Sequence, residues 1–209
     1  MLILVQLNTA TAEQSVSVYG GLQGAFSSNV SGIDAHSEAF DFDATWEGNS
    51  FSAPIYYGFR YSNWLWGDQA ITVDFAHAKV YADSDTLNDN DFNVLEFTDG
   101  LNILTINWLA RAEKEHFYVR PYWGAGLGVT LPHVEVQKTN STAKTYGYQF
   151  GGYAVQAQIG AEKKIAKNWG LFVEYTLNYS INNVDLENNG ELQTNLVTNA
   201  LNLGINYSF

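Results

Sequence analysis

Histidine, lysine, carboxylate and hydroxyl side chains recur at a spacing of two residues in three successive segments of the chain. His77 and Lys79 have this spacing, and so do His133 and Glu135 further along. Imidazole and carboxylate groups together bind divalent metal ions and transfer protons. Residues two apart point to the same face of a β-strand, so neighbouring strands would gather them into one outward-facing patch. We expect this patch to contain His77, Lys79, Glu96, Thr98, Asn102, His133 and Glu135, with Gln149 extending it.

The elements that would position this patch are β-strands with one apolar face. In residues 201–209 the apolar side chains occupy every second position out to a terminal Phe209, and small polar residues alternate with them. This alternation is typical of strands that separate lipid from a polar interior. Similar alternation predicts strands at residues 15–24, 50–63, 69–82, 94–111, 116–136, 148–163, 169–184 and 196–209.

The connections between these strands alternate in length. Residues 64–68, 112–115 and 164–168 are short, whereas 25–49, 83–93, 137–147 and 185–195 are long and polar. Short turns face the periplasm in outer-membrane barrels, which places both termini on that side. The sequence therefore predicts an all-β fold, an eight-stranded antiparallel transmembrane β-barrel with short periplasmic turns and long extracellular loops, in a bacterial outer membrane. A soluble lipocalin-like barrel is the alternative, and it would turn its apolar face inward.

Composition and chain ends fit a single exported domain. Residues 1–12 resemble the tail of a secretory signal peptide ending in Ala-x-Ala, and residues 13–209 are expected to form the barrel. The chain contains no cysteine. Its net charge of −12 argues against a nucleic-acid partner, because phosphate binding needs clustered Lys and Arg. An aromatic Phe209 on an amphipathic last strand resembles the signal by which barrel assembly machinery recognises its substrates.

The opposite face of the strands predicts a polar, filled lumen. Eight strands leave room only for side chains, so we expect a closed network of ion pairs and amides in place of a channel. Two arginines and two acids would form its centre. The predicted lumen residues are Tyr56, Arg60, Asp74, Asn107, Arg120, Gln156, Gln158, Glu174, Asn178 and Asn206.

Four segments resemble the outer-membrane lipid A oxidases. They are DFAHAKVYAD (74–83), LEFTDGLN (95–102), PHVEV (132–136) and TNALNLG (198–204), and the resemblance extends over about residues 15–209. It implies an enzyme that uses molecular oxygen to convert the proximal glucosamine of lipid A to 2-aminogluconate, with hydrogen peroxide as coproduct and a divalent metal ion involved. The first three segments contain the patch.

Lipid A in the lipopolysaccharide leaflet would then be the substrate. Oxidising a sugar hydroxyl removes two electrons, and side chains are poor electron acceptors, so a divalent or redox metal ion is expected. Iron, manganese and copper all suit histidine and glutamate ligands. Asp99 points inward by strict alternation, and a bulge at Gly100 would bring it into the patch. The expected catalytic residues are His77, Glu96, Asp99, His133 and Glu135, the expected metal ligands are His77, Glu96, His133 and Glu135, and the expected substrate-binding residues are Lys79, Thr98, Asn102 and Gln149.

Other functions fit the same residues. A polar patch at this height also arises wherever strands rise above the bilayer into water. A lipid A deacylase would need a hydroxyl nucleophile, and Thr98 beside His77 or His133 and Glu96 would mimic one. A non-enzymatic structural or adhesion barrel would need only the loops.

Overall fold

The computed structural model of the chain describes residues 13–65, 67–97 and 99–209. The predicted signal tail at 1–12 and the candidate site residue Thr98 lie outside these residues. In the described part of the chain, no helix combines the length and the hydropathy needed to cross a membrane.

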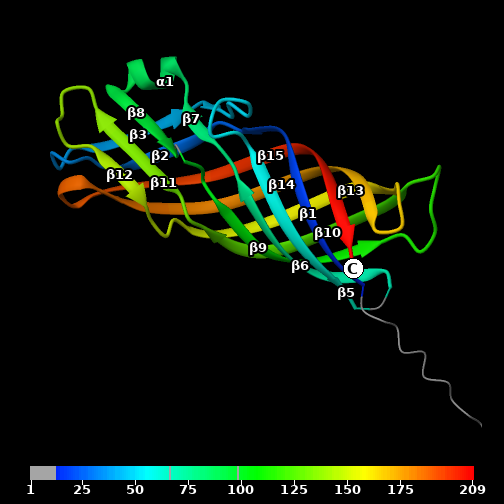
Figure 1. Cartoon of the computed structure of the whole chain (residues 1–209). Helices are drawn as coiled ribbons and strands as arrows, with labels where there is room; N and C mark the ends of the chain where they lie inside the picture. Colours follow the sequence, from blue (N-terminus) through cyan, green and yellow to red (C-terminus); the bar gives the residue numbers. More distant parts are fainter. Residues whose placement is uncertain (1–12, 66, 98) are drawn as a thin grey trace, which may run out of the picture.

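Eight antiparallel strands close into a barrel, as the sequence predicts (Figure 1). Each strand pairs with the next, and the pairing of the first with the last, Ser15 opposite Ser208, closes the ring. Ser208 lies at the end of the barrel that carries the short connections, because its N–H donates to Asn168 O in the connection 165–168. The strands are β1 (Glu13–Ala25), β5 (Tyr57–Trp64), β6 (Gln69–His77), β9 (Ile103–Arg111), β10 (Arg120–Thr130), β13 (Gly152–Lys164), β14 (Trp169–Leu186) and β15 (Gly190–Ser208).

The outer wall of the barrel is apolar and exposed. On β14, Leu171, Val173 and Tyr175 are exposed while the intervening Phe172 and Glu174 are buried. The exposed apolar side chains form a band around the barrel, where a soluble barrel would expose polar ones. The lipocalin-like alternative is therefore wrong. Other members of the band are Val16, Val18, Phe59, Ile71, Val73, Ile106, Trp123, Leu127, Val155, Ile159, Leu201 and Leu203.

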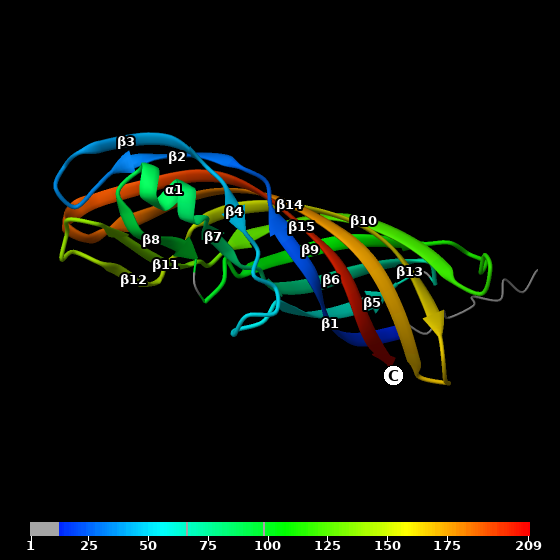
Figure 2. The same cartoon turned by 90° about the horizontal axis from the view of Figure 1, so that it is seen from above.

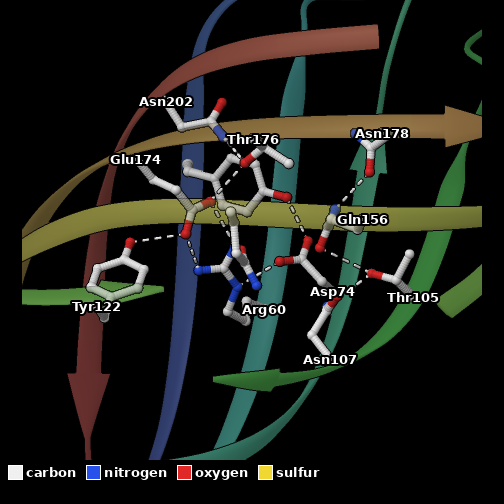
Figure 3. A network of polar contacts seen from close by, with 12 residues as sticks. Arg60, Asp74, Thr105, Asn107, Tyr122, Gln156, Glu174, Thr176, Asn178 and Asn202 are labelled. Atoms are coloured by element: carbon white, nitrogen blue, oxygen red, sulfur yellow. Dashed lines mark hydrogen bonds and ion pairs between the residues drawn. The ribbon is translucent and has the colours of Figure 1, made fainter. Parts of the chain in front are cut away.

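The lumen is filled by a closed polar network centred on Arg60 (Figure 3). Its guanidinium group donates to Asp74 Oδ2 at 2.5 Å, and to both carboxylate oxygens of Glu174 at 2.7 and 2.8 Å. The Tyr122 hydroxyl also donates to Glu174, at 2.9 Å. These charges are buried and mutually paired, which confirms the predicted closed network. The second expected arginine, Arg120, lies at the start of β10, and its Nε has no hydrogen-bond partner among the described residues.

A second folded layer stands on the barrel at the end away from the termini (Figure 1). We call it the outer lobe. It consists of a five-stranded sheet, a hairpin that extends β15, a short helix and the distal ends of β14 and β15. The sheet has the order β12 (Thr145–Tyr148), β11 (His133–Lys138), β8 (Phe92–Phe97), β7 (Val80–Ala82) and β4 (Trp46–Glu47); the hairpin is β2 (Ser28–Ile33) and β3 (Ala39–Ala44), and the helix is α1 (Ser84–Asp89).

The long connections are thus present where expected, but they are folded. Residues 185–195 mostly continue β14 and β15, which turn tightly through the 3₁₀ segment Glu187–Asn189. The cause is a reversal of polarity along each strand. On β15, Leu201 and Leu203 face outward in the apolar band, whereas Leu192 and Leu196 face the interior of the outer lobe. The outer lobe therefore has an apolar core and a polar surface, the pattern of a protein domain in water.

Four neighbouring strands of the barrel wall, β6, β9, β10 and β13, are interrupted where the barrel meets the outer lobe. The breaks lie between His77 and Val80, between Phe97 and Ile103, at residues 131–132 and at residues 149–151. We call these adjacent breaks the seam. β14 and β15 alone cross this height as single strands (Figure 2). The predicted strands 69–82, 94–111 and 116–136 are therefore each two strands, and 116–119 forms a turn before β10. The predicted strand 148–163 begins on the last residue of β12 and continues, after the break, as β13.

Candidate functional site

The candidate residues gather at the seam, and His77 lies at its centre. The ring of His77 is stacked on Tyr57, with 5.0 Å between centroids, and its Nδ1 is 2.9 Å from Asn102 Oδ1. The chain reaches this arrangement through two residues with positive φ, Gly100 at 92° and Asn102 at 46°. A Cβ atom at Gly100 would lie 2.5 Å from His77 Nδ1, so only glycine fits at this position.

The hydrogen bonds of Asn102 fix the tautomer of the neutral His77 ring. Asn102 Nδ2 lies 3.1, 3.3 and 3.2 Å from the carbonyl oxygens of Asp99, Gly100 and Leu131, which can only accept. The amide nitrogen must face these oxygens, so Oδ1 faces His77 and accepts from Nδ1–H. In the neutral imidazole, Nε2 then carries a lone pair. His77 Nε2 is buried and has no hydrogen-bond partner among the described residues.

His133 lies on the next strand pair and is buried in the same way. Its backbone N–H donates to Gly100 O at 3.0 Å, which connects it to the His77 side of the seam. Its ring contacts Tyr146 and Tyr148 edge to face, and its Nδ1 is 3.9 Å from Asp99 Oδ2. At that distance no hydrogen bond forms, and Nδ1 is a second buried imidazole nitrogen without a hydrogen-bond partner in the described part of the chain.

Asp99 thus reaches the outer side of the seam. Strict alternation predicts that this carboxylate points inward, and the break after Phe97 removes that constraint because the backbone leaves strand geometry. In place of the expected bulge at Gly100, β8 ends at Phe97, and Asp99 lies beside His133 because the chain turns there.

Glu96 and Glu135 occupy one row across the outer face of the lobe sheet. They are directly opposite each other on β8 and β11, with Tyr81 and Tyr146 completing the row on β7 and β12. Lys144 Nζ contacts Glu135 Oε1 at 2.5 Å. Burial, together with the carboxylates of Glu96, Asp99 and Glu135, raises the pKa of Tyr81 to about 12. The row therefore concentrates negative charge beside the two histidines.

Lys79 and Gln149 have partners that give them structural roles. Lys79 Nζ donates to the carbonyl oxygens of Asn49 and Ser52 at 3.2 and 2.7 Å, and this holds the chain that precedes β5 against the seam. Burial lowers the pKa of Lys79, and the nearby Glu96 carboxylate opposes that shift. The Gln149 amide donates to Asp185 O and accepts from Asp185 N, both at 2.8 Å. Their predicted contacts with a substrate stay predictions, as does that of Thr98.

The predicted metal ligands do not form a ready metal site. Among the described residues, no group of three or more His, Asp or Glu side chains has an arrangement that could hold a metal ion. His77 is turned toward Asn102, and Glu135 is occupied by Lys144. Metal binding therefore stays a prediction.

Sequence reasoning missed the aromatic residues of the site. Tyr57 packs on His77, and Tyr146 and Tyr148 pack on His133. Burial raises the pKa of Tyr148, and the nearby Asp99, Tyr57 and Tyr146 add to this shift. The alternation of Tyr146 and Tyr148 was the available signal, but it is shared by the lipid-facing strands.

Comparisons with known proteins bear on the fold alone. No protein-family model matches the chain, and no curated protein matches its sequence. The structure is similar to the outer membrane protein OprG from Pseudomonas aeruginosa, with a TM-score of 0.54, 12% identity and coverage of 95% of this chain and 96% of that one. It is also similar to Neisserial surface protein A, with a TM-score of 0.51, 14% identity and coverage of 94% and 97%.

The exposed apolar band and the fold shared with outer-membrane barrels together place the chain in a bacterial outer membrane. The short turns then face the periplasm and the outer lobe stands outside the cell. The seam adjoins the outward end of the apolar band, next to the exposed Tyr153 and Val155 on β13.

Proposed function

We propose that this protein is an outer-membrane lipid A oxidase that converts the proximal glucosamine to 2-aminogluconate at the seam. The observation that carries the proposal is the pair of buried imidazole nitrogens without partners, His77 Nε2 and His133 Nδ1. Three of the segments that resemble lipid A oxidases meet at this place. In this proposal the headgroup of an outer-leaflet lipid meets the protein at the seam.

An unpaired buried polar atom is costly, and this makes the two nitrogens informative. Leaving such a group without a partner costs about 1–3 kcal/mol, so most native structures avoid it. At His77 the cost is imposed by Asn102, whose amide holds the ring in one tautomer. A buried lone pair of this kind is available to accept a proton from a substrate hydroxyl.

The proposed reaction begins at the C1 hydroxyl of the sugar hemiacetal. Its O–H and C1–H bonds break, two electrons and two protons pass to molecular oxygen, and the products are a lactone and hydrogen peroxide. Addition of water then opens the lactone to 2-aminogluconate, so the lipid gains one oxygen. In this proposal His77 Nε2 accepts the hydroxyl proton, and Glu96 and Asp99 are the further carboxylate bases.

A divalent or redox metal ion is part of the proposal because side chains alone do not accept these electrons. The described residues do not form a group that could hold such an ion. No step is therefore assigned to a metal, and the requirement is tested directly with a chelator.

The decisive experiment is mass spectrometry of lipid A after incubation with the full-length protein in vesicles under air. The parent protein should add one oxygen to lipid A and release hydrogen peroxide. The single variants His77→Gln, His133→Gln and Glu96→Gln should lose most of this activity, and a chelator should reproduce the loss in the parent.

His116→Gln is the matched control, because His116 is exposed in the periplasmic turn after β9. It should oxidise lipid A at the parent rate, and every variant should keep the heat-resistant mobility of a folded barrel. Parent-like oxidation by the triple variant H77Q/E96Q/H133Q would show that the seam is only a solvated rim. Loss of an acyl chain would indicate a deacylase, and unchanged lipid A a structural or adhesion barrel.

The last strand carries a separate proposal about assembly. The Phe209 N–H donates to Gln14 O at 2.9 Å, which joins the chain end to β1, while the ring of Phe209 is exposed. Recognition of this strand by the barrel assembly machinery stays a prediction.

A further inference from the structure

Two exposed tyrosines stand beside the buried ring of His133. Tyr146 and Tyr148 are 63% and 64% exposed, although their ring centroids lie only 4.5 and 4.7 Å from that of His133. Both are on β12, the edge strand of the lobe sheet. Contiguous exposed apolar patches rimmed by polar residues mark binding sites, whereas apolar residues exposed singly do not.

The exposed aromatic surface continues into the membrane. Phe150 and Tyr153 follow along the chain, 56% and 70% exposed, with 5.7 Å between their ring centroids. Tyr153 begins the lipid-facing side of β13, where Val155 is the next exposed residue. We call Tyr146, Tyr148, Phe150 and Tyr153 the aromatic track. A ligand that covers this track must be polar at one end and apolar at the other.

The polar end of the aromatic track has the chemistry of a sugar site. Asp99 and the His133 imidazole lie beside Tyr148, while Glu135 and Lys144 flank Tyr146. The Lys144 ammonium is 5.4 Å from the centre of the Tyr146 ring. Sugar rings present an apolar C–H face that packs on aromatic rings, and a rim of hydroxyls that bonds carboxylate and imidazole groups.

We propose that Tyr146 and Tyr148 form a stacking platform for a sugar ring of a membrane-embedded glycolipid. The platform holds the ring against His133, while the acyl chains lie along Phe150 and Tyr153 in the outer leaflet. This inference rests on the proposed function for the identity of the sugar, glucosamine. It adds the residues that bind it, which are binding residues and take no part in proton transfer.

The test measures binding without requiring oxidation. The full chain is held in a sugar-free zwitterionic detergent and titrated with a water-soluble β-1,6-linked glucosamine disaccharide, observed by saturation-transfer NMR. The parent should transfer magnetisation mainly to the protons of one face of a sugar ring. The double variant Y146A/Y148A should bind at least about tenfold more weakly, the loss expected for removing stacked aromatic contacts.

Two variants separate stacking from other causes. Tyr148→Phe keeps the ring and should retain binding, because the platform uses the aromatic face. Tyr175→Ala removes an exposed tyrosine from the lipid-facing side of β14 and should also bind like the parent. Absence of transfer in the parent, or parent-like binding by Y146A/Y148A, overturns the platform.

The outcomes also distinguish this inference from the proposed function. If the parent binds the disaccharide through the two tyrosines but never oxidises lipid A, the platform stands and the oxidase proposal fails. If lipid A is oxidised and Y146A/Y148A leaves the apparent KM unchanged, the oxidase stands and the platform fails.

Discussion

At the scale of single residues, the candidate site shows what side-chain type and spacing predict and what they leave out. The sequence places His77 and His133 on neighbouring segments, and the structure brings both against Gly100. The sequence cannot predict their burial, because the tyrosines that pack on the two rings come from other segments of the chain. Residue type suggested substrate contact for Asn102, whereas its hydrogen bonds give it a positioning role.

Asn102 should therefore control the tautomer of His77. Asn102→Gly keeps a residue that tolerates positive φ but removes the amide, so His77 Nδ1 loses its acceptor. We expect the ring to change from a single Nδ1–H form to a mixture of tautomers, measured by the imidazole ¹⁵N chemical shifts. The exposed His116 should be unaffected in the same sample. An unchanged His77 spectrum would contradict the tautomer assignment.

At the scale of elements, strand existence was predictable and strand continuity was not. Alternation of apolar residues identifies β14 and β15 because it persists along them for the height of the bilayer. Beyond the bilayer the same period continues with the apolar face turned inward, so a long strand end and a polar loop look alike in sequence. The breaks at Gly100 and Pro132 interrupt segments whose composition still favours a strand.

The polarity reversal along β15 makes a charge-tolerance prediction. Leu203 is 64% exposed in the apolar band, and Gln193 is an exposed residue of the same outward parity in the outer lobe. Leu203→Arg should cost about 2–4 kcal/mol of unfolding free energy if its side chain enters the hydrocarbon. Gln193→Arg should cost close to nothing, because its side chain is in water. The measurement is urea unfolding in lipid vesicles, and equal costs would refute the assigned bilayer boundary.

At the scale of the whole molecule, side chains fill the lumen of the barrel, and the candidate site lies outside the lumen. The lumen composition predicted this, because opposite charges and amides were expected on one face of eight strands. Arg60 joins three walls of the barrel through Asp74 on β6, Gln158 on β13 and Glu174 on β14. The sequence could not assign these partners, since strand parity gives the face of a residue but not its height.

Removing Arg60 should therefore destabilise the barrel as a unit. Arg60→Ala leaves the carboxylates of Asp74 and Glu174 buried without their cation, which should cost about 3–5 kcal/mol. The triple variant R60M/D74N/E174Q should recover most of that loss, because no buried charge is left. Tryptophan fluorescence during urea unfolding in vesicles measures both. If Arg60→Ala is as stable as the parent, the network does not stabilise the folded barrel.

The unequal attachment of the outer lobe has a mechanical consequence. Along β14 and β15 the lobe and barrel share two unbroken strands that are paired with each other throughout, whereas the four consecutive strands β6, β9, β10 and β13 are interrupted at the seam. Bending resistance is greatest where strands are continuous, so any rocking of the lobe pivots about β14–β15. The largest displacement in such a tilt then falls at the seam, where it would strain the packing around His77 and His133.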